Sequence, residues 1–189
     1  MASARSQSRG RTDQQGARRR STSRSTSRPA SQLYRVFIPQ FDTVANDPLD
    51  PGKRYHDGIF VETNQQTGEG KLYHVTGDII SKFGMKFAVK DNHIPHRSAR
   101  FFGITEIGTI PESSLGRVYG ILDTVPKPTK QQGLDFWNKY EGDTPYIWVR
   151  EDGERYGPTE QRRPIRKCNE WTKDAKKKLV DTGILKLKK

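Results

Sequence analysis

Residues 168–182 read CNEWTKDAKKKLVDT, and this stretch decides how the C-terminal part of the chain folds. Four small or apolar residues recur in it at the spacing of one helix face: Cys168, Trp171, Ala175 and Leu179. That spacing predicts one amphipathic α-helix beginning at Cys168. The helix is expected to stop before Gly183, because glycine is common just past a helix end.

Cys168 is the only cysteine of the chain, and the predicted helix places it in the first turn. The unpaired backbone N–H groups and the dipole of a helix start favour a thiolate over a thiol. A lone cysteine at a helix start, with histidines upstream, is typical of a cysteine nucleophile. The competing interpretation is a small buried residue that packs beside Trp171.

Charge divides the chain into two parts. The 189 residues carry a net charge of +12, and within residues 1–32 eight arginines against one acid contribute +7, which leaves +5 for residues 33–189. Residues 1–32 contain no Leu, Ile, Val, Phe, Tyr or Trp, so they are expected to be a disordered Arg/Ser-rich tail. Residues 33–189 are expected to form a single domain.

The basic tail leaves three interpretations open. Between Arg20 and Arg28 arginine alternates with hydroxyl residues, which resembles the arginine–serine repeats of nuclear RNA-processing proteins. Such a segment neutralises phosphates, so nucleic acid or an acidic protein is one candidate partner. A mitochondrial transit peptide and a solvated tail without a partner are the others. With no apolar run long enough for a transmembrane segment and no secretory signal, we expect a cytoplasmic or nuclear protein.

The body reads as an α+β domain. A helical pattern lies between Pro111 and Pro126, and the terminal helix follows much later. Five β-prone segments precede these helices, at residues 33–38, 56–63, 71–76, 84–90 and 100–107. A shorter strand is expected at residues 146–149. The order predicts an antiparallel sheet that packs with a C-terminal helix.

Two histidines lie on the hairpin that this pattern predicts. His56 opens one strand and His74 lies on the return strand, so pairing could bring both rings over one face of the sheet. If the terminal helix packs on that face, its start brings Cys168 to the histidines. Histidine is the usual base for a cysteine nucleophile because its pKa lies near neutrality.

These residues carry a family resemblance. The order of His56 in HDGIFVE, His74 in LYHVTG and Cys168 in KCNEWT resembles the circularly permuted papain-like fold. That group includes the NlpC/P60 peptidases, the lecithin retinol acyltransferase-like proteins and the PPPDE peptidases. The chain is also similar to uncharacterised small fungal proteins that carry the LYHVTG and C-x-E-W-T motifs.

The resemblance implies a cysteine hydrolase or acyltransferase that acts on an amide or ester, with an acyl or peptide substrate. Cys168 would attack the acyl carbonyl and form a thioester, His56 would act as base, and His74 would orient it. Asp57 or Asp78 could take the place of His74 as the third group. The alternative is a non-catalytic interaction module of the same fold whose basic tail binds nucleic acid or an acidic protein.

Three further patterns have weaker functional interpretations. His93 and His96 have a spacing that metal ligands use, but no cysteine or acid pair accompanies them, so no metal or cofactor is expected. A basic cluster at residues 162–167 could favour a Cys168 thiolate and attract an anionic substrate. Four aromatic residues could form a nucleic-acid stacking surface or belong to the core and its rim: Trp137, Tyr140, Tyr146 and Trp148.

Overall fold

A computed structural model describes residues 32–43, 46–137 and 145–189. The predicted tail therefore lies outside the described residues except for its last position, and so does Tyr140. By their mutual contacts, residues 31–189 form one compact unit.

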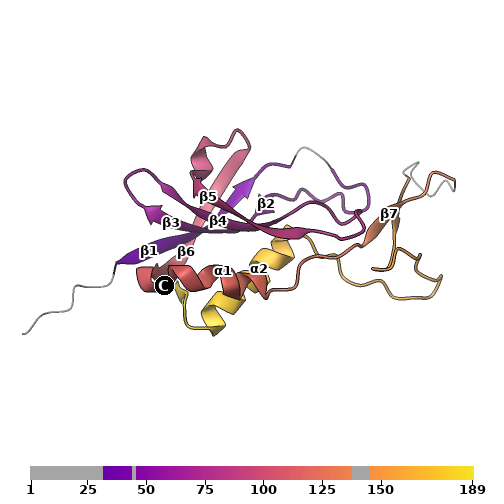
Figure 1. The fold of residues 1–189 in the computed structure, drawn as a ribbon. Helices are drawn as coiled ribbons and strands as arrows, with labels where there is room; N and C mark the ends of the chain where they lie inside the picture. The colour runs from indigo at the N-terminus through magenta and orange to yellow at the C-terminus, as the bar shows by residue number, and fades with distance from the viewer. Residues whose placement is uncertain (1–31, 44–45, 138–144) are drawn as a thin grey trace, which may run out of the picture. The chain divides into compact units, whose positions relative to one another are not determined.

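An antiparallel sheet with two α-helices makes up this unit, so the predicted α+β class is confirmed (Figure 1). The strand order is β5-β4-β3-β1-β6-β9, and β2 pairs with β1. The strands of the sheet are β1 (Leu33–Phe41), β2 (His56–Asp57), β3 (Ile59–Asn64), β4 (Glu69–Thr76), β5 (Lys86–His93), β6 (Phe101–Pro111) and β9 (Lys186–Leu187). The helices are α1 (Leu115–Asp123) and α2 (Cys168–Asp181), and two short 3₁₀ turns are η1 (Pro95–Arg97) and η2 (Glu112–Ser114).

Strand β1 runs through Pro39, where the sequence pattern predicted its end. On one side β1 pairs with β3 as far as Phe37, and it pairs with β2 from Gln40 onward. Pro39 falls between these two partners, where the pairing on that side of β1 is interrupted. A proline is tolerated in a strand at such a gap in the pairing.

Side-chain alternation along β4 separates two apolar clusters, one on each face of the sheet. Tyr73 and Val75 belong to the larger cluster, which includes Trp171 of α2. Leu72 points to the other face and packs with Phe60 in the smaller cluster. Figure 1 shows both helices on the same side of the sheet. The larger cluster therefore fills the space between the sheet and the helices.

Helix α2 begins at the cysteine and ends before Gly183, as its periodicity predicted. Its first turn is held by Glu170, whose carboxylate accepts a hydrogen bond from the backbone N–H of Lys167 at 2.8 Å. Trp171 and Leu179 are fully buried beneath the sheet. The apolar stripe of the helix thus fixes its orientation, with Cys168 at the end that lies beside β2.

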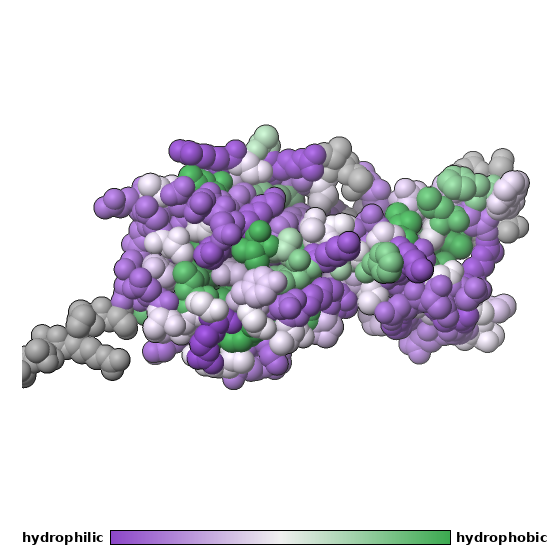
Figure 2. All heavy atoms as spheres, in the orientation of Figure 1, coloured by the Kyte–Doolittle hydropathy of each residue, from purple (hydrophilic) through white to green (hydrophobic). Residues whose placement is uncertain are grey.

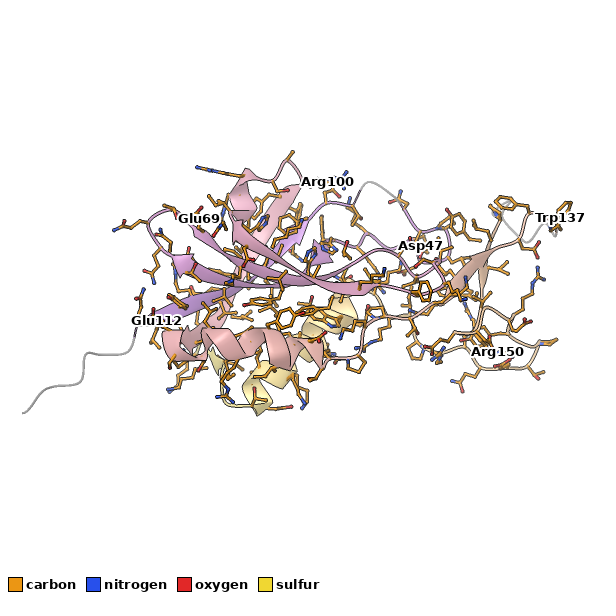
Figure 3. All side chains as sticks on the ribbon, in the orientation of Figure 1. Asp47, Glu69, Arg100, Glu112, Trp137 and Arg150 are labelled. Carbon is orange, nitrogen blue, oxygen red and sulfur yellow. The ribbon has the colours of Figure 1, made fainter. Side chains whose placement is uncertain are left out.

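A small second sheet extends from this body. It pairs β7 (Gln132–Leu134) with β8 (Tyr146–Trp148). Trp137, just beyond β7, is 94% exposed and labelled at the far end of this extension in Figure 3. Figure 2 shows apolar side chains gathered near β7 on a largely hydrophilic face. Among the described residues, no helix is long and apolar enough to cross a membrane.

Candidate functional site

Two histidines form the centre of the candidate site. His56 begins β2 and His74 lies near the end of β4. Their rings meet edge to face with 5.2 Å between centroids, and 2.9 Å separates His56 Nε2 from His74 Nδ1. That distance is a hydrogen bond. The two rings therefore share one face of the sheet, as the predicted hairpin required.

A glycine allows the two strands to come this close. Gly58 lies between β2 and β3, and a Cβ atom added to it would lie 2.6 Å from the Tyr73 carbonyl oxygen and 2.9 Å from His74 Cβ. Any larger residue would push β4 away. The interruption that Gly58 makes in the predicted strand 56–63 is thus a condition of the histidine contact.

The bond between the rings holds one proton when both imidazoles are neutral, and this gives two tautomeric arrangements. If His56 donates from Nε2, its Nδ1 carries a lone pair and is available as a base. If His74 donates from Nδ1, its own Nε2 carries the lone pair instead. The choice of tautomer therefore decides which outer nitrogen of the pair can accept a proton.

Burial keeps this pair neutral. It lowers the pKa of His74 from 6.5 to about 4, with smaller contributions from the neighbouring His56, Lys90 and His93. The pKa of His56 is also lowered, first by burial and then by the charge of Lys90. Both imidazoles are therefore in the form that can accept a proton near neutral pH.

Cys168 lies on the other side of the sheet. Its side chain belongs to the larger core cluster with Trp171, and it is 8% exposed. The expectation that α2 packs on the histidine face is wrong, because Tyr73 and Val75 contact the helix side while His74 between them points away. The start of α2 approaches the histidine pair at the edge of the sheet, where β2 begins.

At this edge Cys168 Sγ lies 3.9 Å from the Tyr55 carbonyl oxygen and 4.0 Å from Asn169 Oδ1. In the described part of the chain, its hydrogen-bond contacts include no histidine nitrogen. Cys168 and His56 nevertheless line the same cavity of about 260 Å³. The two residues thus line one cavity, but no hydrogen bond between them is formed in the described part of the chain.

The thiol is not activated in this state. Burial raises its pKa from 9.0 to about 11, and the nearby Asp57 carboxylate adds to the effect. The sequence suggested that the helix start would favour a thiolate. That expectation is wrong for this state because desolvation of the charged form outweighs the backbone N–H groups.

The residue after the cysteine links the start of α2 to β2 by hydrogen bonds that the sequence pattern did not predict. Asn169 Nδ2 donates to the Tyr55 carbonyl oxygen and to Asp57 Oδ2, both at 2.9 Å. Asp57 is buried, and burial raises the pKa of its carboxyl group. Asp57 therefore faces the helix and not the histidine pair. Asp78, the other candidate third group, accepts from the backbone N–H groups of Ile80 and Ser81.

Acids neutralise much of the basic cluster before the cysteine. Lys167 Nζ lies 2.6 Å from Asp47 and 3.2 Å from Asp50. Arg166 lies 2.7 Å from Asp174. Each ion pair reduces the field that the basic side chain exerts on Cys168. The charges before α2 therefore anchor its first turn to the loop after β1.

Among the residues that the structure describes, the predicted aromatic surface and the histidine pair with metal-ligand spacing are not gathered at the candidate site. Tyr146 and Trp148 are half-buried on β8, and the Arg162 guanidinium lies 4.9 Å from the centre of the Trp148 ring. His96 is exposed and packs on Phe101 at 4.4 Å. No group of three His, Cys, Asp or Glu side chains within residues 32–43, 46–137 and 145–189 is arranged to hold a metal ion.

His93 belongs to the same face of the sheet as His56 and His74, whereas its spacing in the sequence indicated only a pairing with His96. Its ring packs edge to face on Phe41 at 5.9 Å and on Phe60 at 6.3 Å. The strand pairing supplies the reason, since His93 lies opposite Gly70 on β4. A register of this kind is not visible in the sequence of a single strand.

Comparisons with known proteins identify the family but no function. Neither curated proteins nor solved structures give a match to this chain. One family model does match, over residues 44–186, and its span includes both central histidines and the cysteine. The chain therefore belongs to DUF6540, a family of unknown function.

Proposed function

We propose that this protein is a cysteine hydrolase or acyltransferase that acts on an amide or ester through Cys168 and His56. The observation that carries the proposal is the 2.9 Å hydrogen bond between His56 Nε2 and His74 Nδ1, beside a cavity that His56 shares with Cys168. A base whose far nitrogen is held by a polar partner is the arrangement that cysteine catalysis requires. His74 is the positioning residue.

The tautomer in which His56 donates from Nε2 suits this role. It leaves the lone pair on His56 Nδ1, which can take the proton of the Cys168 thiol. The sulfur then attacks the acyl carbon and the carbonyl oxygen becomes an oxyanion, for which the backbone N–H groups at the start of α2 are the donors. When the oxyanion collapses, the leaving amine or alcohol takes the proton from His56 and a thioester remains.

Water or an amine then completes the reaction. It gives its proton to His56 and attacks the thioester carbon, and the departing sulfur recovers that proton as Cys168 returns to the thiol. Because the thiol pKa is about 11 without substrate, the proton moves only once an acyl group occupies the cavity and brings Sγ within reach of His56. The resting protein holds a thiol and a neutral imidazole, not a preformed ion pair.

The test is acylation of the single cysteine by p-nitrophenyl acetate, followed by intact-mass spectrometry. Neutral hydroxylamine removes an acetyl group from a thioester but not from lysine, so it identifies the adduct on sulfur. We expect a hydroxylamine-sensitive adduct in the native protein and none in Cys168→Ser. His56→Gln should slow its formation by about 10²-fold or more. His96→Gln is the matched control, since His96 is exposed and does not line the cavity that His56 shares with Cys168.

The same experiment can favour the alternative, an interaction module in which Cys168 is structural. The observation in its favour is the burial of the thiol against the Tyr55 carbonyl oxygen. If no thioester forms, or if His56→Gln and His96→Gln react alike, the catalytic proposal fails. The basic tail would then supply the affinity for nucleic acid or an acidic protein, in the cytoplasm or nucleus.

A further inference from the structure

A second cavity lies on the histidine side of the sheet, which the cysteine does not reach. Its volume is about 470 Å³. Its floor is formed by the small apolar cluster around Phe41 and Leu72. Ionisable side chains from several strands and loops line the rest: Asp42, His56, His74, Lys90, His93 and Arg100. Figure 3 shows Arg100 on the side of the sheet that faces away from α1 and α2.

Two ring nitrogens in this cavity lack hydrogen-bond partners. His74 Nε2 and His93 Nε2 are both buried, and neither has a partner among the described residues. His74 is only 4% exposed. A buried polar atom without a partner is costly and uncommon, so each one requires an explanation. A ligand that bonds to these nitrogens would provide it.

The charges at the rim show what kind of ligand fits. Strand pairing sets His74 opposite Ala88 and Leu72 opposite Lys90, so Lys90 extends over the same face as the histidines. Its charge contributes to the lowered pKa of all three. Within the described residues, no carboxylate forms an ion pair with Lys90.

Of the other charged side chains at the rim, the positive one has no ion pair with a described residue, and the negative one already has a partner. Arg100, like Lys90, has no ion pair in the described part of the chain. The one acid that lines the cavity, Asp42, is already bonded to Lys53 at 2.5 Å. Among the described residues, the cavity therefore presents two cations without ion pairs beside buried imidazoles, and its lining acid, Asp42, is bonded to Lys53 and also interacts electrostatically with Arg100.

We propose that this cavity binds a small oxyanion, a carboxylate or phosphate group, through His74 Nε2–H and His93 Nε2–H, with Lys90 and Arg100 at its rim. Neutral imidazoles donate one hydrogen bond each, and the rim cations supply charge without entering the apolar floor. The binding site stands on the cavity alone and does not require a reactive cysteine.

Binding would also select a tautomer, and this consequence rests on the proposed function. An oxyanion bonded to His74 keeps the proton on Nε2, so His74 Nδ1 must accept from His56 Nε2–H. The lone pair of His56 is then on Nδ1, which is the form that the thiol reaction needs. An anionic group of the substrate would thereby prepare the base.

The test follows the histidine rings by ¹H–¹⁵N NMR in the full chain, at constant ionic strength, during separate titrations with inorganic phosphate and with acetate. Chloride, added as its sodium salt, is the reference anion. We expect saturable shifts of the His74 and His93 ring signals, and protonation of His74 at Nε2 in the bound form. The signal of the exposed His96 is the internal control and should not saturate. Tighter binding of phosphate or of acetate identifies the group that the site prefers.

Matched variants locate the effect. Lys90→Met should weaken binding about tenfold. Lys173→Met removes the same charge from an exposed position on α2 and should leave binding unchanged. Absence of saturable shifts with either anion, or equal losses in both variants, would overturn the proposal. Cys168→Ala should bind like the native chain, so failure of the thiol chemistry and failure of this site are separate results.

Discussion

At the scale of single residues, one proton shared by His56 and His74 connects the two cavities. His56 lines both cavities, whereas His74 lines only the larger one. Because His56 Nε2 and His74 Nδ1 are hydrogen-bonded at 2.9 Å, fixing the proton on the outer nitrogen of one ring decides whether the outer nitrogen of the other ring carries a proton or a lone pair. A histidine pair of this kind can transmit ligand binding to a base without movement of the backbone.

The buried His74 should make stability depend on pH. Its pKa is about 4 in the folded chain and 6.5 when unperturbed. As pH falls below about 6.5, the unfolded chain takes up the proton first, so the stabilisation is complete above that pH and is lost toward pH 4. Between about pH 7 and pH 5 we expect this residue to cost about 2 kcal/mol of unfolding free energy.

Urea unfolding of the native chain and of His74→Gln at these two pH values measures the effect. His74→Gln should lose less stability on acidification than the native chain, whatever its stability at neutral pH. His96→Gln should retain the native dependence, because His96 is exposed. Equal acid sensitivity of His74→Gln and the native chain would show that His74 is not a source of it.

For the thiol of Cys168 the shift of the pKa is upward, and it should be visible in the reactivity of the thiol. Because burial raises its pKa to about 11, alkylation by iodoacetamide should be slow at neutral pH, and its rate should still be rising with pH above about 9, where the rate of an ordinary thiol levels off. The chain has one cysteine, so the rate reports this site alone. The same chain unfolded in urea is the control and should show an ordinary thiol. An apparent pKa below the ordinary value in the folded chain would contradict the buried, unactivated state.

At the scale of elements, Gly58 controls the contact between the histidine strands. In Gly58→Ala the new Cβ would meet the Tyr73 carbonyl oxygen and His74 Cβ at 2.6 and 2.9 Å. We expect the variant to lose about 1–3 kcal/mol of stability and to lose the coupling between the histidine ring signals. Gly116→Ala is the matched control. Gly116 lies in α1 with open space around it, so alanine there should stabilise by about 0.5–1 kcal/mol.

Both helices and most strands were readable from the sequence, whereas the short strands β7 and β9 and the assembly of the elements were not. The period of residues 168–182 predicted α2 with its first residue, because one apolar stripe on a polar helix has one interpretation. The face of the sheet that α2 covers was predicted wrongly. Ile59, Phe60 and Val61 are consecutive buried residues that serve both clusters, so alternation does not mark one face as the helix side.

The candidate site was predictable to a similar extent. The proximity of His56 and His74 followed from the hairpin, since neighbouring strands bring residues of one face together. Two parts could not follow from the sequence. Asn169 ties α2 to β2 through contacts more than a hundred positions apart in the chain, and His93 joins the histidine face only through the register of β5 with β4.

At the scale of the whole molecule, most of the net charge and the folded core belong to different parts of the chain. Residues 31–189 form a compact unit by their own contacts. Eight arginines against one acid give residues 1–32 a charge of +7, more than half of the total +12. Polyanion binding and folding should therefore be separable by removing the N-terminal segment.

Deletion of residues 1–31 should change the free energy of unfolding by less than about 0.5 kcal/mol, because the core and its hydrogen bonds remain. The same deletion should reduce affinity for duplex DNA of arbitrary sequence by about tenfold or more at low salt, and should lower the slope of log K against log salt, because fewer phosphates are neutralised. A full-length variant with the eight tail arginines replaced by serine separates charge from chain length, and it should match the deletion. If the deletion unfolds the chain, residues 1–31 contribute to the fold. If the serine variant still binds DNA like the native chain, the body carries the interface, and its two rim cations, Lys90 and Arg100, become the first positions to test.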